Sequence, residues 1–270
     1  MKTGSWVLPS KRFKQRILWT FLCSMVLIGI SFFIGFNPTS LFTDFHYVWE
    51  VIGEMLPPDF SGLWKSPAWI IAIGETISMA FLGTVIGSSL SLILAFLCAK
   101  NTMPFSWIRI LVLSFLTSLR SIPTLTFLMI FVIAVGIGPF SGFLTLLIIT
   151  LGTFARLFSE TIENIDPKPS ESIESVGAGN LQIIRFAILP EILPNFIANI
   201  LFSFDVNIRT AIALGVLGGG GIGYQFDEAM RVLHYRQAMA VVFIIILLII
   251  PMEKVSDYQR KKLLGPGLIS

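Results

Sequence analysis

Three ionisable residues, Arg120, Asp205 and Arg209, lie in or beside long apolar stretches of the chain. A charged side chain in the hydrocarbon core of a bilayer costs about 2.5 to 3.5 kcal/mol on insertion scales, so it is usually paired or faces a polar path. Asp205 and Arg209 are four residues apart, share one helical face and can neutralise each other. Two hypotheses stay open: an ion pair that fixes helix packing, or a guanidinium of Arg120 or Arg209 that attracts an oxyanion along a transport path.

A long polar segment interrupts the apolar chain and carries the residue types that start and stop helices. Asp166 followed by Pro167 suits the start of a short helix, which residues 170–176 can continue. Gly177 accepts the left-handed backbone that ends such a helix. The pattern therefore predicts a short helix and a turn.

Residues 181–189 predict a second short helix after this turn, and Pro190 either ends it or opens the next element. The resulting hairpin would lie at the membrane surface and carry apolar side chains, including Ile173, beside its charges. An apolar face of this kind needs a partner or the lipid surface. A solvated connector and a docking element both stay open.

A glycine-rich run follows the fifth apolar stretch. A nucleotide-binding P-loop would require a Lys-Ser or Lys-Thr pair after the glycines, and none follows here. Backbone without side chains suits either a tight turn or a flexible outer gate, and the sequence does not decide between them. The glycines concerned are Gly218, Gly219, Gly220, Gly221 and Gly223.

An enzyme active site or a metal site is not expected. His46 and His234 are isolated and show no metal-ligand spacing. Cys23 and Cys98 fall inside apolar runs, where a buried thiol is the usual role. No basic stretch has the interleaved aromatic residues of a nucleic-acid surface.

The elements that must position the charged residues are membrane-spanning helices. Of the 270 residues, 54% are hydrophobic and 13% are charged, against about 25% charged residues in an ordinary soluble domain. Backbone groups find no water in the bilayer core, so the predicted fold is an all-α integral membrane protein. Pro123 predicts a local kink in the third span. We expect about six spans of ~20 or more residues, over the ranges 17–36, 69–99, 107–136, 139–162, 192–216 and 237–252.

The orientation follows from the basic residues, which precede the first span and follow the last one. Such residues collect on the cytoplasmic side, so both termini are predicted to be cytoplasmic. Alternation of the spans then places the polar segment 163–190 inside and the glycine run near the outer face. Arg231 and Arg236, in the predicted outer loop, run against this rule.

The polar segment resembles the EAA loop of ABC importer permeases. Glu171, Gly177 and the Leu189–Pro190 pair have the spacing of that motif, in which the first glutamate is followed by two alanines and an isoleucine precedes the Leu-Pro pair. Ser172 and Ile173 stand in place of the alanines, and Ala187 stands in place of the isoleucine. In that family the loop forms coupling helices that insert into a groove on a cytoplasmic ATPase. The resemblance assigns ATPase coupling to Glu171, Ile173, Gly177, Leu189 and Pro190.

Further stretches are similar to one branch of this family, the phosphonate transport permeases. The matching stretches are 119–142, 159–163 and 202–223, and with the EAA-like loop the resemblance covers about residues 70–250. It implies a type I ABC importer permease (MetI-like) fold and a homodimer in the bacterial inner membrane. It also implies a substrate-binding protein and an ATPase dimer that holds ATP and Mg, with no cofactor on this chain.

The resemblance thus implies a permease for phosphonate or a related phosphorus oxyanion, such as phosphite, hypophosphite or phosphate. Its domains would be an N-terminal tail, first helix and outer loop (1–66), a transmembrane domain (67–253) and a basic cytoplasmic tail (254–270). A methionine-type permease is the nearest alternative within the class. A secondary transporter is an alternative from outside it, and this alternative gives no reason for the EAA-like spacing.

Overall fold

The computed structural model describes residues 11–35, 43 and 45–264, which form two units that are considered separately. The first unit, Met1–Glu54, contains α1 (Lys11–Ile34) and nearly all of α3 (Phe45–Met55). Within α1, the stretch Gln15–Ile34 is long and apolar enough to cross a membrane. The first predicted span is therefore helical over most of its length.

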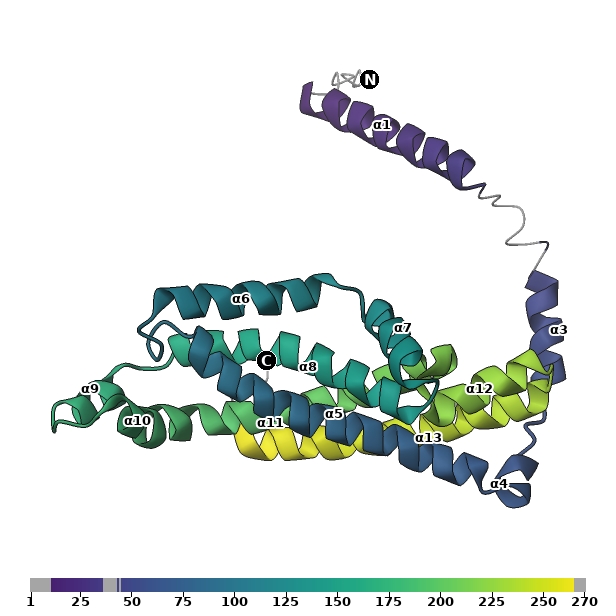
Figure 1. Cartoon of the computed structure of the whole chain (residues 1–270). Coiled ribbons are helices and arrows are strands. Elements are labelled where there is room, and N and C mark those ends of the chain that lie inside the picture. Colours follow the sequence, from purple (N-terminus) through teal and green to yellow (C-terminus); the bar gives the residue numbers. More distant parts are fainter. Residues whose placement is uncertain (1–10, 36–42, 44, 265–270) are drawn as a thin grey trace, which may run out of the picture. The chain divides into compact units, whose positions relative to one another are not determined.

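The second unit, Met55–Ser270, is a bundle of helices, and its described part contains no strand (Figure 1). Its elements are α4 (Ser61–Lys65), α5 (Ala68–Cys98), α6 (Ser106–Ser121), α7 (Thr124–Val135), α8 (Pro139–Glu163), α9 (Lys168–Glu174), α10 (Asn180–Ile183), a π-helix (Ile184–Ile188), α11 (Leu189–Leu214), a second π-helix (Gly215–Gly219), α12 (Gly221–Arg231) and α13 (Tyr235–Leu264). The helices α5 and α8 pack side by side, and α13 runs along α11 and α12.

The expected all-α membrane architecture is confirmed. The described chain has 5 helices long and apolar enough to cross a membrane, or up to 6 if the bent pair α6 and α7 forms one span. This bend is 89°, larger than the local kink predicted from Pro123. Proline disfavours helical geometry in the preceding residue, and Ile122 is accordingly extended, with φ −85° and ψ 127°. The third span is thus two helices that meet at a sharp break.

Small residues let α5 and α8 approach closely. A Cβ atom added at Gly83 would lie 2.8 Å from Cβ of Leu146, and one added at Gly87 would lie 2.8 Å from Cβ of Thr150. Membrane helices use small residues for such contacts because lipid supplies no hydrophobic drive for their association. The Gly83–Gly87 pair is therefore a packing face.

A buried amide joins three of the helices. Asn207 of α11 donates to Thr84 Oγ1 of α5 at 2.8 Å and to Thr150 Oγ1 of α8 at 2.9 Å. All three side chains are buried. Hydrogen bonds between membrane helices contribute about 0.6 to 2 kcal/mol each, so this cluster fixes the relative register of the three helices.

The segment that precedes α5 is hydrogen-bonded to the start of α13. The backbone N–H of Asp59 donates to the carbonyl oxygen of Arg236 at 2.9 Å. The Asp59 carboxylate accepts from the backbone N–H and the hydroxyl of Ser61, at 2.9 and 3.0 Å, and these bonds lower the pKa of this carboxyl below its usual value. The start of α4 is held in place by these bonds.

Candidate functional site

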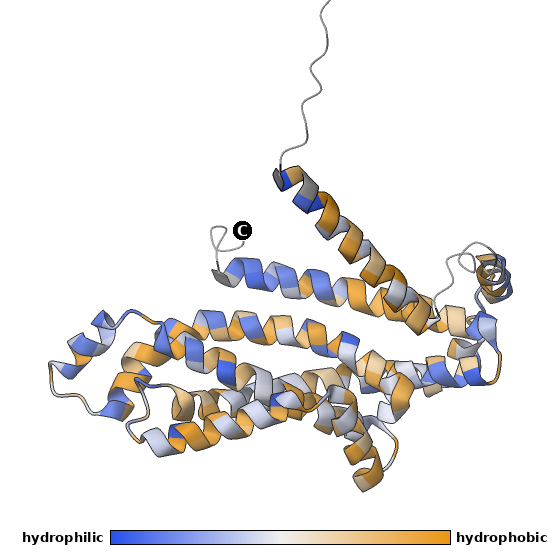
Figure 2. Cartoon of the chain, turned by 90° about the horizontal axis from the view of Figure 1, so that it is seen from above, coloured by the Kyte–Doolittle hydropathy of each residue, from blue (hydrophilic) through white to orange (hydrophobic). Residues whose placement is uncertain are grey.

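The segment 163–190, called the coupling segment below, protrudes as a hairpin at one end of the bundle (Figure 1), and hydrophilic residues gather on it (Figure 2). Its first helix, α9, begins at Lys168, whose backbone N–H donates to Asp166 Oδ1 at 3.1 Å. The predicted helix start at Asp166 and Pro167 is confirmed to within one residue. Glu171 is exposed on α9, and Ile173 is half-buried.

Apolar side chains of this hairpin are open to the surroundings. Val176 is 83% exposed, Leu181 is 82% exposed and Phe186 is 62% exposed. A connector that is only solvated would not be expected to expose three large apolar side chains that contact so little of their own chain. Their exposure favours a docking surface over a connector.

Only one glycine of the turn between α9 and α10 needs to be glycine. Gly177 has φ +87° and donates its N–H to the carbonyl oxygen of Glu174 at 2.9 Å. Gly179 has an ordinary extended backbone, with φ −77°, and its N–H donates to Gln182 Oε1 at 2.9 Å. Neither position is crowded, because an added Cβ would meet nothing within 4 Å. The difference between the two is therefore purely conformational.

The helix predicted over 181–189 is present, formed by α10, the π-helix and the first residue of α11. Of the two alternatives for Pro190, the second holds: Pro190 lies in the first turn of α11, and no loop separates the two elements. Proline lacks an N–H and clashes with the carbonyl one turn earlier, which normally breaks a helix. Here the preceding turn, Ile184–Ile188, is a π-helix, and such local adjustments let a membrane helix pass a proline.

The base of the coupling segment is buried against the bundle. Ile188 and Ile192 pack with Phe154, Phe158 and Ile162 of α8. The hairpin therefore continues into α11 without a loop, and its root is held in the apolar core. A displacement of the hairpin would be carried directly into the span.

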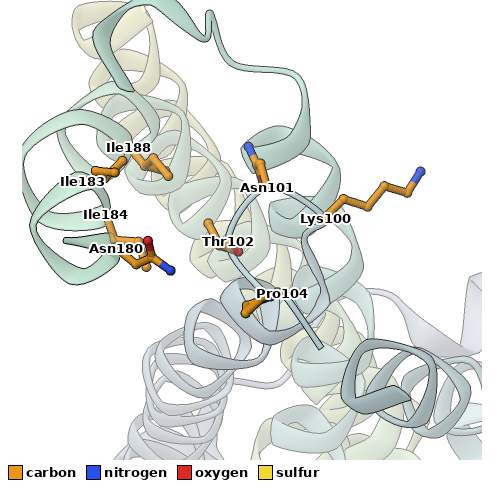
Figure 3. A pocket seen from close by; sticks show the side chains of 8 residues that line it. All are labelled: Lys100, Asn101, Thr102, Pro104, Asn180, Ile183, Ile184 and Ile188. Atoms are coloured by element: carbon orange, nitrogen blue, oxygen red, sulfur yellow. The ribbon is translucent and has the colours of Figure 1, made fainter. Parts of the chain in front are cut away.

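A cavity of about 190 Å³ lies at this root, between the coupling segment and the connection from α5 to α6 (Figure 3). The connection is tied to the end of α8, because the N–H of Lys100 donates to Glu163 Oε1 at 2.9 Å and Asn101 Nδ2 donates to the carbonyl oxygen of Ile162 at 2.6 Å. The opposite wall is formed by α10 and the π-helix that follows it, with the side chains of Asn180, Ile183, Ile184 and Ile188.

Two of the three intramembrane charges predicted from the sequence form an ion pair. Arg209 Nη2 lies 3.1 Å from Asp205 Oδ2 and 2.8 Å from Glu253 Oε2 of α13. The predicted pairing of Asp205 with Arg209 is confirmed. Glu253 was missed, because the last span was expected to end at residue 252, whereas α13 continues past Pro251 to Leu264.

Arg120 is placed differently. It lies in the last turn of α6, directly before the break, and no described side chain pairs with it. Its Cγ would lie 3.4 Å from a Cβ added at Gly152 in the middle of α8. A cavity of about 210 Å³ opens here, lined by Leu119, Arg120, Ile122, Thr124, Phe127, Ile148, Ile149, Gly152 and Thr153.

The glycine run forms a tight turn from α11 into α12. Gly218, Gly220 and Gly221 have φ of +101°, +76° and +70°. A Cβ at Gly220 would lie 2.6 Å from the backbone nitrogen of Pro139, and one at Gly223 would collide with the carbonyl oxygen of Ile212. The run is thus tightly packed; its role as an outer gate stays a prediction.

Two residues of α5 cap the helix that follows this turn. The N–H of Gly221 donates to Glu75 Oε2 at 3.1 Å, and the N–H of Ile222 donates to Thr76 Oγ1 at 2.9 Å. Sequence reasoning missed both, because donor and acceptor are 146 residues apart. The sequence did contain a signal for this role, because Glu75 is a carboxylate within the second predicted span and directly precedes Thr76.

Residues 87–263 match the family described as binding-protein-dependent transport system inner membrane component. The chain belongs to this family. It is therefore a multi-pass transport permease of the inner-membrane type, and the membership expected from the EAA-like spacing is confirmed. As a permease subunit it transports solute and is not a catalyst.

Two relatives share about a third of their aligned residues with this chain. The phosphite transport system permease protein PtxC of Stutzerimonas stutzeri is 31% identical over 237 residues, which cover 87% of this chain and 85% of that protein. The phosphate-import permease protein PhnE of Mycolicibacterium smegmatis is 34% identical over 235 residues, which cover 87% of this chain and 43% of that protein.

The fold is shared with solved ABC transporters. A structure of the methionine ABC transporter MetNI in an inward-facing conformation aligns with a TM-score of 0.65 and 20% identity, and the alignment covers 77% of this chain and 100% of that one. The MetI-like permease fold expected from the sequence is confirmed.

Proposed function

We propose that this chain is the membrane-spanning subunit of an ABC importer that takes up a phosphorus oxyanion such as phosphite, phosphonate or phosphate. The cargo class rests on the relatives, which are a phosphite permease and a phosphate-import permease at 31% and 34% identity. A methionine-type cargo has weaker support, because a methionine permease relative from Pasteurella multocida is only 27% identical.

The observation that carries the importer mechanism is the coupling segment. It places Glu171 and the exposed Val176 and Leu181 on a hairpin that protrudes from the bundle. Leu189 and Pro190 form the junction with α11. In this proposal Glu171, Ile173 and the turn at Gly177 contact the ATPase, and the Leu189–Pro190 junction transmits its movement to the span.

The partners follow from this role. ATP and Mg bind to a dimer of separate ATPase subunits, which dock on the coupling segments of two permease copies. A substrate-binding protein delivers cargo to the opposite face, and the family description supports such a protein. Both termini and the coupling segment are then cytoplasmic, in the inner membrane of a bacterium.

The transport cycle can be written as a chain of movements. When the ATPase pair closes on ATP, it displaces the coupling segment. Because the chain is helical without a loop from Asn180 to Leu214, the displacement reaches the middle of the bundle directly. The two copies then open outward, the binding protein releases its cargo between them, and ATP hydrolysis restores the inward-open state.

The test compares Gly177→Val with Gly179→Val in the chain coexpressed with its ATPase and binding protein. Valine at φ +87° is strained, whereas valine at φ −77° is not, and both sites are otherwise uncrowded. We expect Gly177→Val to lose ATPase activity stimulated by the loaded binding protein, and Gly179→Val to keep it. If the wild-type chain neither copurifies with an ATPase nor responds to the loaded binding protein, the proposal is wrong and a secondary transporter becomes the better account.

A further inference from the structure

The cavity at the break between α6 and α7 lies near the middle of the length of α8, on an open side of the bundle where Arg120 and Thr153 are exposed. Gly152 of its lining is 11 residues from the end of α8 at Glu163 and 13 from its start at Pro139. At 1.5 Å rise per residue, the cavity is about 17 Å or more from either end of this helix. Lipid headgroups lie at the surfaces of the bilayer, so a headgroup phosphate is too far away to neutralise a charge at this depth.

Three polar side chains line this cavity, those of Arg120, Thr124 and Thr153. Many hydroxyl groups elsewhere in the spans bond to their own helix: Thr84 and Thr145, for example, donate to the carbonyl oxygen four residues earlier, at 2.6 and 2.8 Å. Within residues 45–264, no hydrogen bond or ion pair engages the side chain of Arg120, Thr124 or Thr153. The cavity thus presents a cation and two hydroxyls that the bundle leaves unused.

The unused groups match the chemistry of a tetrahedral oxyanion. A guanidinium binds two oxygens of such an ion through parallel hydrogen bonds, and it keeps its charge at every physiological pH. Two hydroxyls can donate to the remaining oxygens. A cavity of about 210 Å³ also exceeds the ~30 Å³ that one water molecule occupies in the liquid, so there is room for an ion with some of its hydration.

Arg209 offers no comparable site. Its guanidinium is already held by Asp205 and Glu253, at 3.1 and 2.8 Å. These two carboxylates would repel an approaching oxyanion. The positive charge available to cargo in this part of the bundle is therefore that of Arg120.

We infer that the break cavity, with Arg120, Thr124 and Thr153 as ligands, is an oxyanion-binding station on the transport path. This inference rests on the proposed function. Arg120 attracts the ion after the binding protein has released it, and the two threonines orient it. Binding involves no covalent step.

The first experiment uses the complete transporter, with its ATPase and binding protein, in proteoliposomes. Uptake of labelled phosphate, phosphite and methylphosphonate is measured beside ATPase activity stimulated by the loaded binding protein. Arg120→Gln should lower uptake at least about tenfold while stimulated ATPase activity stays near the wild-type value, and Arg120→Lys should recover part of the uptake. Arg109→Gln, the same charge change near the start of α6, is the matched control and should transport normally.

The outcomes separate the two proposals. If the wild-type transporter shows neither uptake of any of these ions nor ATPase stimulation, the proposed function fails. If the wild type transports and Arg120→Gln transports equally well, the proposed function stands and the station is wrong. If Arg120→Gln lowers ATPase stimulation as much as uptake, the residue acts on assembly and the station is also wrong.

A second experiment does not depend on the stability of Arg120→Gln. Arg120→Cys is made with Cys23→Ala and Cys98→Ala, which remove the native thiols, and is modified with cationic trimethylammonium-ethyl methanethiosulfonate. Modification should restore uptake by restoring the charge, and millimolar phosphate or phosphite should slow it several-fold in vesicles of neutral lipid. Protection that requires anionic lipid, with none from the soluble ions, would assign the cavity to a headgroup and overturn the inference.

Discussion

Arg120 and Arg209 both lie within spans of this bundle, and their surroundings differ. Arg209 contacts Asp205 at 3.1 Å and Glu253 at 2.8 Å, whereas Arg120 has no ionic partner within residues 45–264. A charge that the protein has neutralised serves the packing of helices, while a charge left without a partner at membrane depth needs water or a ligand. The depth of a charge in the membrane therefore does not reveal its role, whereas the groups that pair with it do.

The backbone explains the difference. Around Arg209 the helix α11 is continuous, so a residue four positions earlier shares its face, and the long helix α13 runs beside it and brings Glu253 into reach. Around Arg120 the helix stops, because Pro123 forces Ile122 out of helical geometry. The helix axis changes direction by 89° at this break. A residue one turn after Arg120 therefore does not share its helical face and could not pair with it there.

The largest effect is expected when the ion pairs of Arg209 with Asp205 and Glu253 are broken. Arg209→Gln leaves Asp205 and Glu253 close together without a cation and should destabilise the protein by about 2 to 3 kcal/mol. The thermal midpoint of the purified complex and the amount of folded protein in the membrane should both fall.

A rescue separates this effect from a loss of transport chemistry. Adding Asp205→Asn and Glu253→Gln to Arg209→Gln removes the unpaired acids and should restore most of the stability. If the triple variant is as unstable as Arg209→Gln alone, the cluster does more than neutralise charge.

A smaller effect is expected when the Arg120 cavity is filled without a change in charge. A Cβ at Gly152 would lie 3.4 Å from Cγ of Arg120, so Gly152→Val occupies space that the ion needs. We expect several-fold lower oxyanion uptake with ATPase stimulation retained. An equal loss of both activities would show that the substitution disturbs the packing of α6 on α8.

The smallest effect is expected from Thr153→Val, which replaces one hydroxyl by a methyl group of similar size. One lost hydrogen bond is worth about 0.5 to 1.5 kcal/mol, so uptake at limiting substrate should fall two- to about tenfold. Thr117→Val, on the exposed side of α6 where the hydroxyl bonds to Leu113 of its own helix, is the control and should have no effect. Uptake by Thr153→Val equal to that of the wild type would remove this hydroxyl from the station.

The sequence predicted what depends on local pattern. The spans follow from apolar runs, and the Asp205–Arg209 pair follows from a spacing of four residues. The Gly177 turn likewise follows from the residue type, because φ +87° favours glycine. These features need no knowledge of distant neighbours.

What the sequence could not supply depends on contacts between distant parts of the chain. Glu75 and Glu253 gain their roles from partners 146 and 44 residues away. Pro123 predicted a kink, but the size of the bend is set by packing around it. The sequence left open whether Pro190 ends a helix or opens the next element; it lies in the first turn of α11, directly after a π-helical turn. The unpartnered state of Arg120 is also a tertiary property, and it is this state that identifies the candidate station.

The most direct test of the account measures oxyanion uptake by two variants side by side in the complete reconstituted transporter. One is Arg120→Gln, and the other is the triple variant Asp205→Asn, Arg209→Gln, Glu253→Gln. The account predicts that the triple variant retains most of the uptake of the wild type while Arg120→Gln loses it, with ATPase stimulation present in both. Uptake that survives in Arg120→Gln and is lost in a stably assembled triple variant would contradict the account and place the transport charge at Arg209.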